Sequence, residues 1–149
     1  MRTPSPDERK RRIASFLAHQ RTGVISVIAG QGMWSMPVWY RLAYGPFGGR
    51  GLELDCLVPR WTDVAHHLSE KAKVLLIVQA PSSAGLCWAQ VRGTASPVEV
   101  PDWARLLPRW VWVLRMQSDE LYMVLRVTPS RIDLIDESEG WGIQETLEW

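Results

Sequence analysis

The sequence predicts a mainly β (α+β) domain in which six antiparallel strands close into a small barrel. Two observations favour this class. Short β-branched and apolar runs recur along the chain between Gly- or Pro-containing turns, and helix signals occur at only three places. These signals predict an N-terminal helix, a short crossover helix and a helix before the last hairpin. Because 149 residues suit a single core, we expect residues 1–149 to form one domain.

The composition narrows the class of function. Seventeen basic and sixteen acidic residues give a net charge of +1, which does not favour nucleic acid as a partner. The longest unbroken apolar run, Val74–Val78, is far shorter than the roughly 18–20 residues that span a bilayer. Because the N-terminus is charged and has no apolar signal region, we expect a cytoplasmic protein without membrane contact.

Two residue types have counts that bear on function. Cys56 and Cys87 show no metal-ligand spacing and are too few for a disulfide framework, so we expect two reduced thiols. The nine Trp residues are consistent with core packing, a subunit interface or an aromatic ligand pocket, and the count does not choose among these.

The first helix is expected within residues 1–20. Ser5 can cap it, Pro6 suits the first helical position, and Glu8 completes a capping box. The basic run from 9 to 12 is interpreted as a solvated helix face, because the total charge is close to zero.

The first two strands are expected at Val24–Ala29 and Met33–Leu42, as a hairpin. Pro37 lies inside the second strand and cannot donate a ladder hydrogen bond, which predicts an edge, a bulge or an opening in the barrel wall. Unpaired backbone groups at such an opening could bind a ring-shaped ligand.

The middle of the chain predicts a strand, a helix and a strand. Leu52–Leu57 alternates, so Leu52, Leu54 and Cys56 should share one face. Thr62 is a plausible N-cap for a crossover helix that reaches Glu70. The apolar run Val74–Val78 then predicts a central strand.

The last third predicts three strands and a helix. Leu86–Ala95 should form a strand in which Gly93 marks a bulge that bends the barrel wall. An apolar stripe over Val100–Met116 predicts a helix with a kink at Pro108. The remaining expected segments are strands at Leu121–Val127 and Arg131–Ile135, a turn at Thr128–Ser130 that joins them, and a tail over 137–149.

Four motifs, in this order, carry a resemblance to a known family: Pro37–Tyr40, Leu68–Val74, Val91–Ala95 and Tyr122–Ile132. Together they resemble the FMN-binding split barrels of the pyridoxamine 5′-phosphate oxidase-like superfamily, over roughly residues 16–149. The resemblance implies a six-stranded split barrel, a homodimer with two flavin sites across its interface, and flavin-dependent oxidoreductase activity.

The resemblance also implies a set of cofactor-binding residues. Backbone groups of the second strand would line the isoalloxazine ring, the end of the third strand would lie beside the ribityl chain, and the following turn would bind the phosphate. A partner subunit and the C-terminal tail would each approach the cofactor with an indole. The residues at these positions are Met36, Pro37, Val38, Trp39, Arg41, Cys56, Leu57, Arg60, Thr62, Trp88 and Trp141.

One motif departs from the family pattern. The family's phosphate turn has a hydroxyl followed by Arg and Lys, whereas this chain has Thr62, Asp63 and Val64. Arg60 and the N-terminus of the helix could replace the missing cations. The departure leaves two alternatives to FMN open: a flavin-free dimer that acts as a ligand-binding or interaction module, and a reductase that binds a deazaflavin (coenzyme F420).

The sequence names neither a substrate nor a catalytic acid or base. Trp39, Tyr40 and Trp141 are the candidates for stacking on a flat, conjugated substrate. Asp63, His67 and Glu70 would share a helix face with metal-ligand chemistry, and His66 is adjacent. With no further ligand cluster nearby, we interpret that face as solvated. We therefore expect no metal site.

Overall fold

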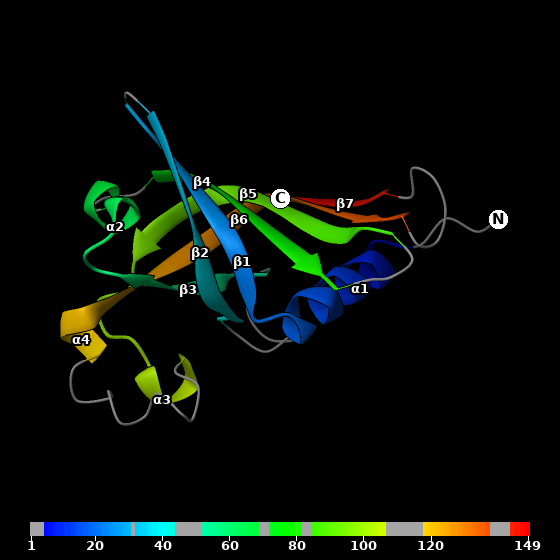
Figure 1. The fold of residues 1–149 in the computed structure, drawn as a ribbon. Coiled ribbons are helices and arrows are strands. Elements are labelled where there is room, and N and C mark those ends of the chain that lie inside the picture. Colours follow the sequence, from blue (N-terminus) through cyan, green and yellow to red (C-terminus); the bar gives the residue numbers. More distant parts are fainter. Residues whose placement is uncertain are drawn as a thin grey trace.

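The computed structural model describes residues 5–30, 32–43, 52–68, 72–81, 85–106, 118–137 and 144–149. Within these ranges seven strands form one antiparallel sheet, in the order β3-β2-β1-β4-β5-β6-β7. An additional β3–β6 pairing closes β1 to β6 into a ring, so the predicted six-stranded barrel is confirmed (Figure 1). The elements are α1 (Pro6–His19), β1 (Thr22–Ala29), β2 (Gly32–Leu42), β3 (Leu54–Pro59), α2 (Asp63–His67), β4 (Ala72–Ala80), β5 (Cys87–Pro97), α3 (Trp103–Leu106), α4 (Ser118–Leu121), β6 (Tyr122–Asp136) and β7 (Gln144–Glu148).

Helix α1 begins as the sequence predicts. The Glu8 N–H donates to Ser5 Oγ at 3.2 Å, and the Ser5 N–H donates to the Glu8 carboxylate at 3.3 Å, which completes the capping box. The face that carries Ile13 and Leu17 is fully buried in the barrel core. The Tyr40 hydroxyl donates to the Leu17 carbonyl at 2.6 Å, and this bond joins the helix to β2. Helix α1 is therefore part of the core.

Strands β1, β2 and β4 form the middle of the sheet. β1 pairs with β2 over its whole length, as the predicted hairpin requires. β4 pairs with β1 on one side and β5 on the other, which confirms the central position expected for Val74–Val78. Residues that point inward, such as Ile25 and Leu76, are fully buried.

The predicted turn at Thr128–Ser130 is wrong, because β6 runs through it as a single bent strand. Its first half pairs with β3 and closes the barrel, while its second half pairs with β7. The β5–β6 register shifts between Arg92 and Gly93, where Pro129 lies opposite. This irregularity confirms the bulge predicted at Gly93 and lets one strand belong to two pairings.

Leu52, Leu54 and Cys56 all pack in the barrel core, which confirms that they share one face. All residues from Leu54 to Val58 are buried, because a second apolar cluster covers the outer face of the strand. Leu57 packs there with Leu106 of α3 and Val124 of β6. Helix α3 therefore encloses a small core outside the barrel.

Strand β7 forms in the segment expected to be a tail. It pairs with the second half of β6, and an ion pair between Arg12 and Glu145 connects it to α1. Asp133 is buried beneath β7. Burial raises the pKa of Asp133, but hydrogen bonds from Arg131, Thr146 and Gln144 outweigh burial and hold this pKa below its usual value.

The helices differ from prediction in length. Thr62 caps α2 as expected, but α2 ends at His67 instead of continuing to Glu70, which lies outside the described residues. Of the helix predicted over Val100–Met116, the structure describes only the part up to Leu106, and α3 begins at Trp103. Among the described residues, no helix has the length and apolar character needed to cross a membrane.

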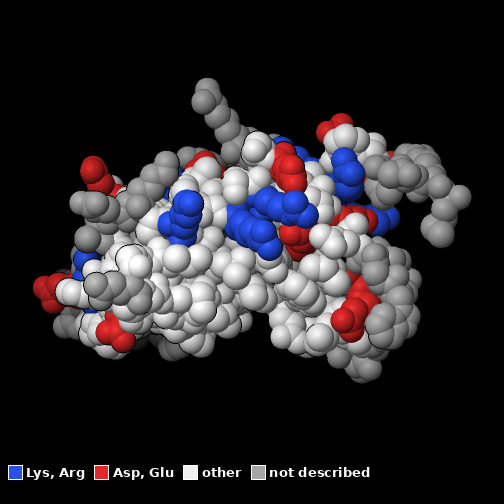
Figure 2. Space-filling model, turned by 90° about the horizontal axis from the view of Figure 1, so that it is seen from above, with Lys and Arg blue, Asp and Glu red and all other residues white. Residues whose placement is uncertain are grey.

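Charged side chains of both signs share one face of the molecule. Figure 2 shows Lys and Arg side chains gathered over the middle of this face with Asp and Glu side chains beside them. Cations and anions are interspersed there, in keeping with the net charge of +1.

Candidate functional site

One edge of β2 is open over part of its length. β2 pairs with β1 from Gly32 to Trp39, but its ladder with β3 begins only at Trp39. Within the described part of the chain, the stretch from 32 to 38 therefore has a strand neighbour on one side only. The opening that Pro37 predicts is present, and the segment is paired along its other edge.

The alternation of backbone hydrogen bonds fixes which groups face the open edge. The Tyr40 N–H donates to the Arg21 carbonyl of the β1 side at 2.9 Å. Backbone groups of successive residues point to opposite edges, so those of Ser35 and Pro37 point away from β1. Pro37 thus costs no ladder bond, and the Pro37 carbonyl and the Ser35 N–H and carbonyl face the opening.

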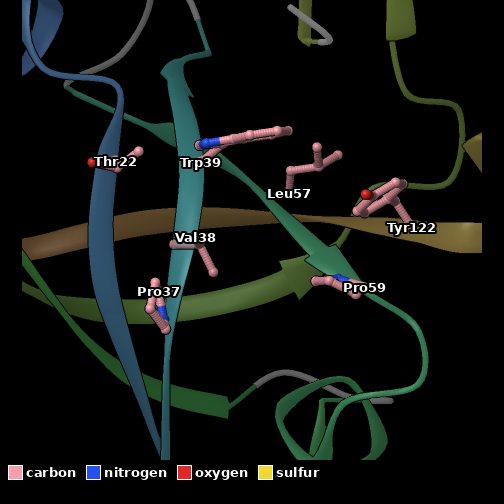
Figure 3. A pocket seen from close by; sticks show the side chains of 7 residues that line it. All are labelled: Thr22, Pro37, Val38, Trp39, Leu57, Pro59 and Tyr122. Carbon is pink, nitrogen blue, oxygen red and sulfur yellow. The ribbon is translucent and has the colours of Figure 1, made fainter. Parts of the chain in front are cut away.

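A hollow of about 220 Å³ lies on the outer face of the barrel beside this edge (Figure 3). We call it the outer hollow. Trp39 extends from β2 toward the side where Leu57 of β3 and Tyr122 of β6 lie, and Thr22 comes from β1. The lining is mostly apolar and aromatic: Thr22, Pro37, Val38, Trp39, Leu57, Pro59 and Tyr122.

A second hollow of about 290 Å³ follows β2 in the other direction, toward α2. We call it the helix-side hollow. Each hollow alone is below the roughly 300–1,000 Å³ typical of ligand pockets, and the two together reach that range. The residues that line it are Trp34, Ser35, Met36, Trp61, Thr62, Asp63 and Val64.

The helix-side hollow does not have the character of a phosphate site. Thr62 Oγ1 already donates to the Pro59 carbonyl at 2.8 Å and accepts from the Ala65 N–H at 3.2 Å. Asp63 is exposed and brings a negative charge to the lining. An anion placed there would meet this carboxylate without a free hydroxyl donor from Thr62.

His67 has a packing partner that the sequence did not predict. Its ring stacks on the indole of Trp34, with centroids 3.7 Å apart and planes 21° apart. His66 meets His67 edge to face at 5.3 Å. These contacts give His67 an aromatic environment beside the helix-side hollow.

The structure brings some predicted site residues together and separates others. Pro37, Val38, Trp39 and Leu57 line the outer hollow, whereas Met36 and Thr62 line the helix-side hollow. Arg41 lies at the end of β2, on the same face as Trp39. Arg60 is exposed in the turn before α2, and its backbone N–H bonds the Leu121 carbonyl.

Three other candidates lie away from the two hollows. Cys56 is fully buried in the barrel core, where burial and then the charge of Asp55 raise the pKa of the thiol to about 12. Trp88 is half-buried on β5 and lines neither hollow. Trp141 lies outside the described residues.

Tyr40, expected to stack on substrate, points into the core. Strand alternation sends its neighbours Trp39 and Arg41 outward, so Tyr40 faces α1. Burial, then the nearby Cys56, raises the pKa of the Tyr40 phenol well above its usual value. Its ring is therefore not available to the outer hollow.

Tyr122, Pro59 and Thr22 line the outer hollow and were not predicted as site residues. Tyr122 faces Pro59 across the β3–β6 pairing, which joins segments more than sixty residues apart. No local pattern encodes that register. Thr22 lies opposite Trp39 because β1 begins two residues before the predicted start at Val24.

No family model matches this sequence, and no curated protein matches it. Solved structures do match its fold. A heme binding protein from Mycobacterium smegmatis has a TM-score of 0.68 and 17% identity, covering 99% of this chain and 60% of that protein's length. The General Stress Protein 26 from Bacillus anthracis has a TM-score of 0.63 and 18% identity, covering 94% of this chain and 98% of that one.

A third match is a protein related to general stress protein 26, of the pyridoxinephosphate oxidase family, from Clostridium acetobutylicum. Its TM-score is 0.69 at 9% identity, and the match covers 97% of this chain and 96% of the other. At such low identities these matches establish the fold. This chain has the split-barrel fold of pyridoxamine 5′-phosphate oxidase-like proteins.

Proposed function

We propose that this chain, with its split-barrel fold, is a flavin-binding oxidoreductase of the pyridoxamine 5′-phosphate oxidase-like superfamily. The observation that carries the proposal is the one-sided pairing of β2 from 32 to 38, beside an aromatic-lined hollow. Similar folds belong to proteins of the pyridoxinephosphate oxidase family.

The outer hollow suits a flat conjugated ring. Trp39 and Tyr122 supply aromatic surface, Leu57 supplies apolar surface, and the open edge supplies the Pro37 carbonyl. An isoalloxazine ring has a polar edge that can pair with such backbone groups, and its remaining faces are apolar. The bound flavin would supply the redox chemistry, while these residues bind and orient the ring and exclude water.

The residues expected around the phosphate of FMN differ from those of the family pattern. The Thr62 hydroxyl already makes two hydrogen bonds, and the negative charge of Asp63 would repel the phosphate. The ring therefore supplies most of the binding free energy in this proposal. A deazaflavin, with its different tail, remains the alternative cofactor.

Asp63 also supports a second candidate function, a flavin-free split barrel that binds a flat ligand as a module. One relative in fold is a heme binding protein, and heme is also flat and conjugated. Among the described residues that line the outer hollow, Tyr122 is the one with a side chain of metal-ligating chemistry.

Riboflavin and FMN titrations test the proposed function. Either flavin should quench the Trp fluorescence of the protein. The substitution Trp39→Leu should weaken riboflavin binding about tenfold, because the stacking surface is lost. Trp149→Leu is the matched control, since Trp149 is exposed and lines neither hollow.

Absence of any response to riboflavin, FMN or a deazaflavin would reject the flavin proposal. Binding of hemin alone, with no flavin response, would support the module instead. A Trp149→Leu variant that loses as much affinity as Trp39→Leu would move the site away from the outer hollow.

A homodimer is the expected assembly, because apolar side chains are exposed on the outer face of the sheet. Val24 on β1 is 43% exposed and lies opposite Ile77 of β4, and Ile28 is 59% exposed opposite Met33 of β2. Exposed apolar side chains gathered on one face of a sheet are typical of an interface.

Sedimentation should therefore give the mass of two chains. The substitution Val24→Lys should reduce this mass to one chain, because it would bury an unpaired ammonium in the interface. Val100→Lys should leave the dimer intact, since Val100 is 88% exposed and outside this patch. A wild-type protein that sediments as one chain contradicts the expected dimer.

A further inference from the structure

Three arginines lie close to one another at the end of β2, beyond the Trp39 that lines the outer hollow. Arg41 follows Trp39 by two residues on the outer face of β2. The Arg21 carbonyl accepts from the Tyr40 N–H at 2.9 Å, which places Arg21 opposite the residue before Arg41, and its charge acts on Arg41. Arg105 approaches from α3, and its Nη1 donates to the Leu42 carbonyl at 2.6 Å.

The buried carboxylate close to these arginines already forms ion pairs. Asp55, which is 1% exposed, accepts from Arg105 at 2.6 Å and from Arg126 at 2.9 Å. One carboxylate thus serves two guanidinium groups. Among the residues that the structure describes, the side chains of Arg21 and Arg41 have no hydrogen-bond or ion-pair partner.

The arrangement leaves an excess of positive charge around Arg41, which is half-buried, while Arg21 and Arg105 are exposed. Burial lowers the pKa of Arg41, and the charges of Arg21 and Arg105 lower it further. Like charges at this spacing repel one another, and a bound anion would relieve the repulsion. Guanidinium groups also match the geometry of carboxylate and phosphate oxygens.

We propose that Arg21, Arg41 and Arg105 form a binding site for an oxyanion, a carboxylate or phosphate, on a flat molecule that occupies the outer hollow. Trp39 joins the two parts of the site, because it lines the hollow and lies on the same strand face as Arg41. The hollow binds the apolar ring, and the arginines bind the anionic group. The site therefore selects anionic aromatic molecules over neutral ones of the same shape.

The anion has two possible sources, the substrate or the phosphate of a flavin. Asp63 disfavours a phosphate in the helix-side hollow, at the opposite end of the open edge. If the anionic group belongs to the substrate, the inference rests on the proposed function and names its substrate class: aromatic carboxylates or phosphates. The anion site itself does not require a flavin.

Calorimetric titration with naphthoate, naphthyl phosphate and neutral naphthamide tests the site. The wild-type protein should bind the two anions at least about tenfold more tightly than the amide, since hydrogen bonds to charged groups contribute that much. Arg41→Gln should abolish the preference, and Arg41→Lys should retain part of it. Arg11→Gln is the matched control, because it removes the same charge from the exposed face of α1.

Flavin titrations of the same variants separate the sources. If Arg41→Gln weakens FMN binding but leaves riboflavin binding unchanged, the anion is the phosphate of the flavin. If Arg41→Gln weakens naphthoate binding but leaves FMN binding and riboflavin binding unchanged, the anionic group belongs to the substrate. If riboflavin does not bind while the preference for naphthoate persists, the flavin proposal fails and the anion site stands.

Two results would overturn the anion site. One is equal affinity of the wild-type protein for naphthoate and naphthamide, or no binding of either. The other is an Arg41→Gln variant, folded by circular dichroism, that keeps the full preference for the anions. Higher salt should weaken naphthoate binding and leave naphthamide binding unchanged, which checks the electrostatic origin independently.

Discussion

Replacing Gly93 with Ala should destabilise the protein by about 3 kcal/mol or more, because the bulge leaves no room for a side chain. A Cβ at this position would overlap the Thr128 carbonyl oxygen and lie 2.9 Å from the Cα of Pro129. Both neighbours are backbone atoms of β6, so relief requires the strand to move. Urea unfolding of the purified variant measures the effect.

Gly32→Ala provides the matched control. Its added Cβ would make only ordinary contacts, the nearest with the Trp34 ring at 3.4 Å. We expect the free energy of unfolding of this variant to stay within about 1 kcal/mol of the wild type. If Gly93→Ala is as stable as Gly32→Ala, then β5 and β6 do not cross as closely as described.

Replacing Asp55 with Asn should cost about 2–4 kcal/mol of folding stability. The neutral amide cannot compensate the charges of Arg105 and Arg126, which both bond this buried carboxylate. The three residues join α3 to β3 and β6, so the loss should also loosen α3. Thermal or urea unfolding, with protection of residues 103–106 from hydrogen exchange, reports both effects.

Glu99→Gln serves as the control for Asp55→Asn. Glu99 is an exposed carboxylate with no ion pair among the described residues, and its loss should change stability by no more than about 0.5 kcal/mol. An Asp55→Asn variant within the same margin would show that the buried ion pairs do not hold α3 to the barrel.

Much of the barrel could be predicted from the sequence, because its signals are local. The β-branched run before Gly30 and the apolar, aromatic run after it define a hairpin. The unbroken apolar run at Val74–Val78 defines a strand with two neighbours. The turn predicted at Thr128–Ser130 failed for a physical reason. Pro129 does not break the strand, because the pairing with β5 skips Ser130 opposite the step from Arg92 to Gly93, so the bulge on β6 takes up the bend.

The candidate site was predictable on β2 and, through the family resemblance, at Leu57 of β3. Pro37 and Trp39 lie on one strand, and the missing N–H of proline identifies the open edge locally. Tyr122 and Arg105 reach the site through pairings and packing with residues far away in the sequence. Such long-range register has no local signal, so neither the far wall of the hollow nor the arginine group could be inferred.

Hydrogen exchange along β2 tests the central claim most directly: the open edge of this strand binds a flat redox-active ring. Mass spectrometry would follow amide exchange in peptides that cover residues 32–43, with and without riboflavin. We predict that riboflavin slows exchange in this segment and in 54–59, while β4, paired on both sides, changes little. Unchanged exchange over 32–43 in a protein saturated with riboflavin would contradict the account.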